Sequence, residues 1–236
     1  MKRSILMTIF AATLFLANPA LAERLELGFA LTPTVMQDVG YEAFSSSDLR
    51  ALRLGIDIRS EVASLGGFKI IPLIGYRAAF DSGSPYNVID TDLALHDLYG
   101  GLRVRKGITS WFGAFLEFSG GILFADLGGA QSEEDAFEYG DLGARQSYDD
   151  LKYTWSAAGL AGLEFQLPKS WLRSRGVKWV GFGAELAGGY VRRGDIEFEP
   201  SIESGGDNAM DAETRPWGQV NLSGWMIQVA ASFRFF

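Results

Sequence analysis

The single histidine of the chain, His96, is the first residue to consider for chemistry, because Asp97 follows it directly. A histidine oriented by a carboxylate activates a serine in hydrolytic triads, and Ser82 and Ser84 precede this pair. Around His96 the sequence reads LALHDLYG, and no serine follows at a suitable spacing. We therefore interpret His96 as a loop-end histidine in water and predict no catalytic residue. Because triad members can come from different strands, an enzyme centred on His96 is kept as the third alternative.

A second group of candidate residues is acidic. The stretch from Asp126 to Asp150 carries eight acids against Arg145, and the stretch from Asp195 to Arg215 carries seven acids against one arginine. Clustered carboxylates are the oxygen ligands that Ca²⁺ and Mg²⁺ take. Neither stretch contains the D-x-[DN]-x-[DN]-G pattern of a calcium loop. We therefore expect only weak and irregular binding of divalent cations there, and we predict no defined metal site and no cofactor.

The remaining charged residues belong to a repeated pattern that must position them. Apolar residues alternate with small, polar or charged ones, which is typical of β-strands with one apolar face. The pattern occurs in eight segments, at residues 24–31, 52–59, 68–77, 98–105, 112–124, 152–165, 180–190 and 225–235. The sequence therefore predicts eight strands.

Short and long connections alternate between these segments. The short ones are 60–66, 106–110 and 168–177, and the longer ones, rich in Gly, Ser, Asp and Glu, are 34–48, 81–92, 127–150 and 196–219. Short turns on one side and long loops on the other are the layout of a bacterial outer-membrane barrel. The charges share a face with the glycines, and the other face carries hardly any charge over its central part, which suits hydrocarbon. The strongest rival, a soluble periplasmic barrel with a ligand in its centre, would put its charges outside.

We therefore predict an all-β fold: a transmembrane, antiparallel, up-and-down β-barrel of eight strands, with short periplasmic turns and four longer extracellular loops. Amphipathic aromatic rings at both strand ends would form two interfacial girdles. Trp111, Trp171 and Trp179 lie near short turns, and Tyr153, Trp155, Tyr190 and Trp225 lie near long loops. The turn PKSWLRSRGVK carries four basic residues and no acid, which predicts that it faces anionic headgroups of the inner leaflet.

The N-terminus carries an export signal. Lys2 and Arg3 precede an apolar stretch, residues 5–16, and Ala20-Leu21-Ala22 ends it. This pattern predicts a secretory signal peptide, residues 1–22, cleaved after Ala22, and leaves residues 23–236 as the barrel domain. Without Lys2 and Arg3 the charge is 19 basic against 29 acidic residues, or −10, which argues against nucleic acid as a partner. The chain has no cysteine, so neither disulfides nor thiolate metal sites contribute.

The inward face of the predicted barrel is charged. An eight-stranded barrel has room mainly for its own side chains, and an isolated buried ion costs several kcal/mol. We expect a plug of ion pairs and waters, with a narrow and slightly anion-favouring pathway as the alternative. The predicted inward charges are Arg53, Asp57, Arg59, Lys69, Arg77, Arg103, Arg105, Glu117, Lys152, Glu164, Glu185 and Arg234.

The last five residues, SFRFF, resemble the C-terminal assembly signal of outer-membrane barrels. Phe233 and Phe235 follow the alternation, and Phe236 lies one step beyond it. With the signal peptide and the eight segments, the mature chain resembles the OmpA/OmpX/OmpW-like superfamily of small outer-membrane barrels over its whole length. The resemblance is architectural. It implies a monomer in the outer membrane, with membrane lipids, lipopolysaccharide and the barrel-insertion machinery as partners.

Small barrels of this kind include structural proteins, channels, adhesins and enzymes, so fold does not settle function. We expect a non-enzymatic envelope-structural or surface-interaction role through the acidic extracellular loops. The second possibility is a narrow channel, or porin, for small solutes or ions through the charged lumen. The third possibility is an outer-leaflet lipid-modifying enzyme around His96, because outer-membrane lipid A acylases and deacylases use a histidine near the outer rim. Divalent cations at the acidic loops would include those that bridge lipopolysaccharide phosphates.

Overall fold

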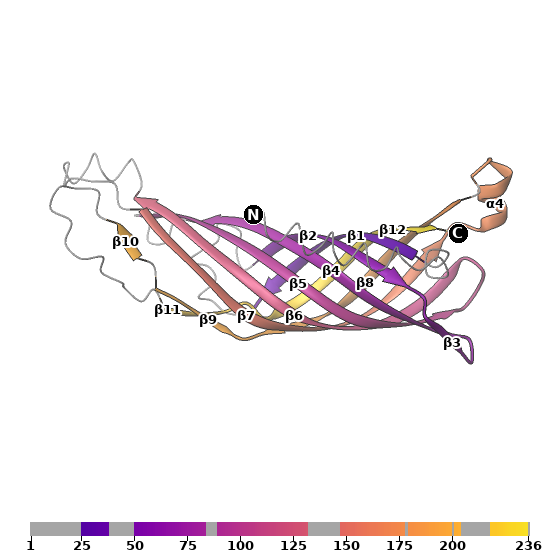
Figure 1. Cartoon of the computed structure of the whole chain (residues 1–236), viewed down its shortest axis with the longest axis horizontal. Coiled ribbons are helices and arrows are strands. Elements are labelled where there is room, and N and C mark those ends of the chain that lie inside the picture. The colour runs from indigo at the N-terminus through magenta and orange to yellow at the C-terminus, as the bar shows by residue number, and fades with distance from the viewer. Residues whose placement is uncertain are drawn as a thin grey trace.

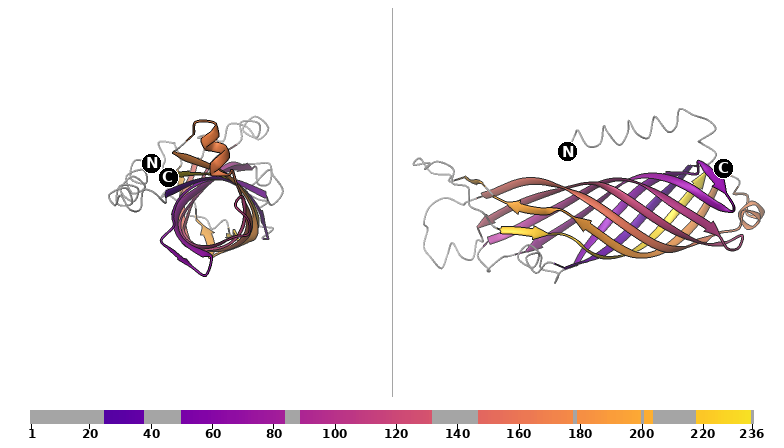
Figure 2. Two further views of the ribbon diagram at one scale, coloured as in Figure 1. Left: turned by 90° about the vertical axis from the view of Figure 1, so that its right-hand side faces the viewer. Right: turned by 90° about the horizontal axis from the view of Figure 1, so that it is seen from below.

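Eight long strands close into an antiparallel barrel. The computed structural model describes residues 25–37, 50–83, 89–131, 147–177, 179–199, 201–203 and 218–235. The barrel strands are β1 (Leu25–Met36), β2 (Arg50–Ser60), β4 (Phe68–Gly83), β5 (Ile89–Gly107), β6 (Phe112–Gln131), β7 (Ser147–Gln166), β8 (Val180–Arg193) and β12 (Gly224–Phe235). Consecutive barrel strands pair, and β12 pairs with both β8 and β1, so the ring has no open edge along its shared length (Figures 1 and 2). The predicted eight-stranded antiparallel barrel is confirmed.

The two ends of the barrel carry different small elements. At one end, here called the turn end, lie β3 (Ala63–Leu65), which pairs with β4, and the short helix α4 (Lys169–Ser174). At the other, the loop end, β9 (Asp195–Phe198) pairs with β11 (Gly218–Asn221), and β10 (Ser201–Glu203) pairs with β7. No helix among the described residues has the length and hydropathy that crossing a membrane requires.

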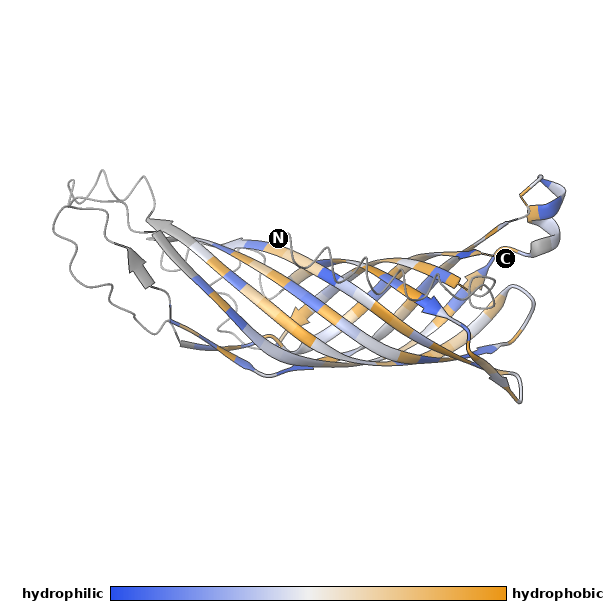
Figure 3. Cartoon of the chain, in the orientation of Figure 1, coloured by the Kyte–Doolittle hydropathy of each residue, from blue (hydrophilic) through white to orange (hydrophobic). Residues whose placement is uncertain are grey.

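Side chains alternate between the two faces of the wall because successive residues of a strand point to opposite sides. On β2, Leu52 and Leu54 are each 60% exposed, whereas Arg53 between them is 2% exposed. The same alternation runs along β1 and β12 and appears as stripes of opposite hydropathy in Figure 3. The barrel therefore places many of its apolar side chains outside and buries charged ones.

Several strands run further than the sequence pattern predicted. β5, β6 and β7 contain 19, 20 and 20 residues. Residues 81–83 and 89–92, expected within a loop, are strand, as are 127–131 and 147–150. The expected turn 168–177 contains α4, and the expected turn 60–66 contains β3. The loop prediction was wrong at residues 81–83, 89–92, 127–131 and 147–150, because pairing continues across residues whose composition is typical of loops.

Glycine is required where two strands come very close. A Cβ atom on Gly189 of β8 would lie 2.0 Å from the backbone oxygen of Gly159 on β7. A Cβ on the neighbouring Gly188 would meet no atom within 4 Å. Gly189 therefore allows β7 and β8 to lie close together at this point, whereas Gly188 faces open space.

Two sequence predictions lie outside the described residues. These are the signal peptide with its cleavage after Ala22, and the terminal aromatic Phe236 of the assembly signal. The two other aromatics of that signal, Phe233 and Phe235, lie on β12. The ring of Phe233 meets Phe29 and Phe182 edge-on, with centroids 5.7 and 5.4 Å away. Phe233 therefore joins the strands on either side of β12.

Candidate functional site

The turn-end half of the lumen is filled by ten charged side chains, here called the lumen network. Most of its members are almost completely buried, and Arg234 at its edge is 20% exposed. Five arginines face five carboxylates, so the formal charges of the network cancel. Its members are Glu26, Asp57, Arg59, Arg77, Arg103, Arg105, Glu117, Glu164, Glu185 and Arg234.

Glu26 on β1 is the most connected carboxylate of this network. It accepts hydrogen bonds from Arg59 at 3.0 Å and from Arg105 at 3.3 Å. Arg234 of the closing strand adds two more, from Nε at 2.9 Å and from Nη2 at 2.6 Å. One side chain of the first strand thereby holds arginines from β2, β5 and β12, which fixes their register.

Glu185 and Glu117 hold Arg103 from two sides. Arg103 donates from Nη1 to Glu185 at 2.9 Å, and from Nε and Nη2 to Glu117 at 3.0 and 2.7 Å. Glu185 also accepts a hydrogen bond from Arg59. Hydrogen bonds between charged groups of this kind are about twice as strong as neutral ones. These hydrogen bonds therefore hold the charged side chains together across the lumen.

Aromatic rings complete the packing around the arginines. The guanidinium of Arg77 lies 4.0 Å from the ring centroid of Tyr99, and that of Arg103 lies 3.9 Å from the centroid of Phe115. Such cation–π contacts contribute about 2 kcal/mol when they are desolvated. Phe115 is also part of a buried apolar cluster with Leu160 and Met226. Charged, aromatic and apolar side chains together thus fill this half of the lumen.

A smaller polar group lies further toward the loop end. Arg53 and Arg193 each approach Oδ2 of Asp97 at 3.6 Å. The Ser156 hydroxyl donates to the other oxygen of Asp97 at 2.8 Å. Arg193 also donates to the backbone oxygen of Leu222. Asp97 therefore ties together strands β2, β5, β7 and β8 in the middle of the lumen.

The loop-end half of the lumen is apolar instead of charged. A cluster of twelve buried apolar side chains, here called the apolar plug, fills it. None of them is more than 3% exposed. The apolar plug consists of Met36, Ala51, Ala79, Leu93, Leu95, Leu123, Ala125, Leu127, Ile196, Phe198, Val220 and Leu222.

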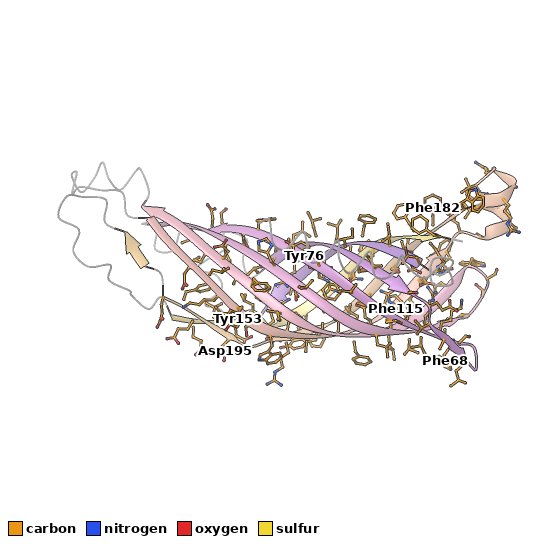
Figure 4. The ribbon with its side chains drawn as sticks, viewed as in Figure 1. Phe68, Tyr76, Phe115, Tyr153, Phe182 and Asp195 are labelled. Atoms are coloured by element: carbon orange, nitrogen blue, oxygen red, sulfur yellow. The ribbon has the colours of Figure 1, made fainter. Side chains whose placement is uncertain are left out.

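The outer surface changes polarity at the same level. Along β6, outward Ile122 and Phe124 are 48% and 36% exposed, and the next outward residue, Asp126, is charged and exposed. Inward Glu117 gives way to Leu123 and the rest of the apolar plug. Toward the turn end the barrel is thus apolar outside and charged inside, whereas toward the loop end its interior is apolar and charged residues such as Asp126 join apolar ones on the outer face. Figure 4 marks Tyr153 and Asp195 toward the loop end, and Phe68 and Phe182 toward the turn end.

His96 lies outside the lumen. The Tyr76 hydroxyl is 2.5 Å from Nδ1 of His96, the two rings are stacked, and Phe80 meets the imidazole edge-on with centroids 5.8 Å apart. Ser82 pairs in register with Asp92, not with His96, and Ser84 lies outside the described residues. His96 is therefore half-buried beside two aromatic rings, and it lies within β5 and not at the end of a loop.

Three carboxylates of the lumen network have the spacing that a metal ion would need. Oxygens of Glu26, Glu164 and Glu185 lie within 4.8 Å of one another. The same carboxylates accept hydrogen bonds from Arg59, Arg103 and Arg105. Because guanidinium groups already supply the positive charge, we interpret this cluster as part of the ion-pair network.

The twelve predicted inward charges do not share one environment. Ten of them belong to the lumen network or contact Asp97, and all of these except Arg234 are nearly buried. Lys69 and Lys152 have side chains 41% and 31% exposed. Lys69 pairs with Glu61 at 2.8 Å, and Lys152 approaches Asp150 at 3.5 Å. These two lysines lie at the barrel ends instead of in the network.

Sequence reasoning missed three central residues, Glu26, Asp97 and Arg193. Each of these residues lies in the inward frame of a strand that the alternation predicts. Glu26 lies between apolar Leu25 and Leu27, Asp97 lies two residues before Tyr99, and Arg193 extends the inward frame of β8. Extending every frame to the end of its strand would have found all three.

A cavity of about 320 Å³ opens at the turn end. Ser110, Gln166, Ser232 and Arg234 supply most of its polar lining, and Gly181, Gly183, Phe182 and residues 167, 168 and 170 complete it. Arg234 already donates to Gln166 and Glu26. The cavity therefore ends against the lumen network.

No protein family matches the sequence, and no curated protein matches it. Solved structures with a similar path of the chain include the outer membrane protein OprG from Pseudomonas aeruginosa, at 11% identity and a TM-score of 0.48, covering 90% of this chain and 96% of that one. The outer membrane protease OmpT from Escherichia coli has 11% identity and a TM-score of 0.45, covering 91% of this chain and 97% of that one.

A third similar structure is Ail, the attachment invasion locus protein of Yersinia pestis. It has 11% identity and a TM-score of 0.40, covering 90% of this chain and 95% of that one. At these identities the similarities assign no role to any residue of this chain.

Proposed function

We propose that the chain is an integral outer-membrane barrel with a closed lumen, and that it acts through the surface of its loop end in a non-enzymatic envelope or surface-interaction role. The observation that carries this proposal is the change of polarity along the barrel, from a charged interior toward the turn end to an apolar interior toward the loop end. Toward the turn end, the interior is charged and closed and the exterior is apolar. Toward the loop end, an apolar interior resembles the core of a water-soluble protein.

The outward apolar belt has the height of a bilayer. On β7, exposed aromatic residues mark both limits, Tyr153 and Trp155 toward the loop end and Phe165 toward the turn end. Between Tyr153 and Phe165 the strand rises about 40 Å at ~3.3 Å per residue. A tilt of ~45° converts this rise to about 28 Å, close to the ~30 Å of bilayer hydrocarbon. The belt therefore supports membrane insertion with the aromatic rings at the two interfaces.

Two successive obstacles support a lumen that does not conduct. The lumen network fills the turn-end half with paired charges, and the apolar plug fills the loop-end half. An ion crossing the plug would lose its hydration without finding polar partners, at a cost of several kcal/mol. A narrow channel is the alternative function. It is favoured by buried oxygens of Thr32, Thr34 and Gln228 that lack hydrogen-bond partners among the described residues, because such oxygens indicate water inside the lumen.

The long strands support a role for the loop end. About 9–11 residues are enough for a strand to cross a bilayer, so strands of 19 and 20 residues continue well beyond it. There the apolar plug acts as the core of a soluble β-structure. The described ends of these strands thus form a support beyond the membrane, and connections on such a support commonly carry binding functions.

The surroundings of His96 support a non-enzymatic role. Asp97 faces the lumen and accepts a hydrogen bond from the Ser156 hydroxyl, so it does not orient the imidazole of His96. The group hydrogen-bonded to His96 is the Tyr76 hydroxyl. A serine nucleophile activated by His96 would have to lie within hydrogen-bonding reach, and Ser82 is displaced along the strand.

The proposal is tested on intact cells that display the protein. Residues 132–146 and 204–217 are replaced, separately and together, by short Gly-Ser linkers, and an epitope tag in the linker verifies surface exposure. Binding of cells to amine-coated and carboxylate-coated microspheres is then measured. We expect the acidic loop end to favour amine-coated spheres, and the double replacement to abolish that preference. Equal binding by full-length and trimmed proteins that are both surface-exposed would overturn the proposal.

A further inference from the structure

We propose that α4 and the residues that follow it form a binding site for anionic phospholipid headgroups of the periplasmic leaflet. This inference rests on the proposed membrane insertion, with the turn end in the periplasm. It assigns a ligand to a surface that the proposed function does not use. The exposed side chains that form the site are Trp171, Arg173, Arg175 and Trp179.

The segment is held rigidly at the edge of the barrel. Leu172 is buried at 3% exposure and fixes α4 to the molecule. The Leu172 N–H donates to the Pro168 oxygen at 3.2 Å, and the Val177 N–H donates to the Leu172 oxygen at 3.0 Å. Gly176 ends the turn with a φ of +83°, a conformation that favours glycine. The exposed side chains are therefore presented from a fixed backbone.

The position of α4 points its surface to the membrane boundary instead of the lumen. Seen along the barrel axis from the turn end, α4 lies outside the ring of strands (Figure 2, left). The lipid-facing belt reaches the same edge, because Phe165 precedes α4 and Phe182 follows it, and both are exposed apolar residues. At the edge of such a belt, the hydrocarbon of the bilayer gives way to the lipid headgroups. α4 therefore lies at the level of the headgroups.

The chemistry of the site fits a phosphate above acyl chains. Trp171 and Trp179 are 45% and 75% exposed, and tryptophan prefers the bilayer interface. The guanidinium of Arg175 lies 4.6 Å from the ring centroid of Trp171, so the ring orients a cation at its own level. Arg173 adds a second exposed cation in the last turn of α4. Guanidinium groups bind phosphate oxygens in a bidentate manner.

The test uses the folded full chain in mixed micelles or nanodiscs. Quenching of tryptophan fluorescence is measured with brominated phosphatidylglycerol and, separately, with brominated phosphatidylcholine. We expect tighter apparent binding of phosphatidylglycerol, and a loss of about fivefold per arginine in Arg173→Gln and Arg175→Gln, as basic residues near anionic membranes typically contribute. Trp171→Phe and Trp179→Phe together should remove most of the phosphatidylglycerol-dependent quenching.

Arg192→Gln is the matched control, because Arg192 is exposed near the loop end and should leave the preference unchanged. Competition by inorganic phosphate separates recognition of a free anion from recognition of the whole headgroup. An unchanged preference in the double arginine variant, or an equal loss in Arg192→Gln, overturns the inference. If phosphatidylcholine also fails to quench the belt tryptophans, membrane insertion itself fails, so the two failures can be distinguished.

Discussion

His96 and Asp97 are consecutive residues of β5, yet the barrel wall separates their side chains. Asp97 is buried in the lumen, where Ser156 donates to it at 2.8 Å. His96 lies on the outer face, where the Tyr76 hydroxyl is 2.5 Å from its Nδ1. The pair looks like two members of a triad in the sequence, and the strand places them in different environments because its side chains alternate.

This separation predicts opposite consequences for substitutions at the two positions. His96→Ala should keep the barrel folded and change the free energy of unfolding by about 1 kcal/mol or less, because it removes only surface contacts. Asp97→Ala should cost about 3–5 kcal/mol, because Arg193 loses the carboxylate that it contacts. Urea unfolding in lipid vesicles measures both. A larger loss for His96→Ala would show that the outer contact stabilises the barrel more than the inner one.

The lumen network predicts a second contrast. Glu185→Gln weakens contacts to Arg59 and Arg103 in a fully buried position, so it should destabilise the barrel by about 3–5 kcal/mol. Lys69→Gln removes an end-of-barrel pair with Glu61 that is partly exposed, and such pairs contribute about 1 kcal/mol or less. The midpoint of the unfolding transition in both variants is the measurement. Similar losses in the two would contradict a buried and cooperative network.

Two adjacent glycines give a steric prediction. Gly189→Ala places a methyl group against the backbone oxygen of Gly159, so it should separate β7 from β8 and cost about 2 kcal/mol or more. Gly188→Ala meets open space and should be neutral, or stabilising by up to about 1 kcal/mol. The yield of heat-modifiable folded protein and its unfolding free energy report the difference. A tolerated Gly189→Ala would mean that the two strands do not approach so closely.

Much of the barrel could be predicted because the period of two is a property of each strand by itself. The outward frame of β2 and the inward arginines Arg53 and Arg59 follow directly from alternation. The extension of β5 and β6 could not be predicted in this way. Asp92 and Asp126 have the composition of loops, and only the pairing of neighbouring strands shows that they lie on the outer face of a paired strand.

The interior was predicted less completely than the wall. Alternation says which side chains point inward, but it does not say which of them meet. The four hydrogen bonds from arginines to Glu26 come from three different strands, which no local pattern contains. The apolar plug was missed for a similar reason, because Ile196 was assigned to a loop and Val220 to no strand, and β9 and β11 place both in the lumen. α4 is too short to produce a recognisable helical period.

The central claim is a membrane-inserted barrel whose lumen is closed by the lumen network and the apolar plug. Its most direct test is the conductance of the refolded chain without the predicted signal peptide, residues 23–236, in a planar lipid bilayer, with boiled protein as the control. Insertion is established in the same preparation by protease protection and heat modifiability. The account predicts no stable conductance steps from inserted protein. Reproducible steps that disappear on boiling would contradict it and would make the lumen charges the selectivity elements of a narrow channel.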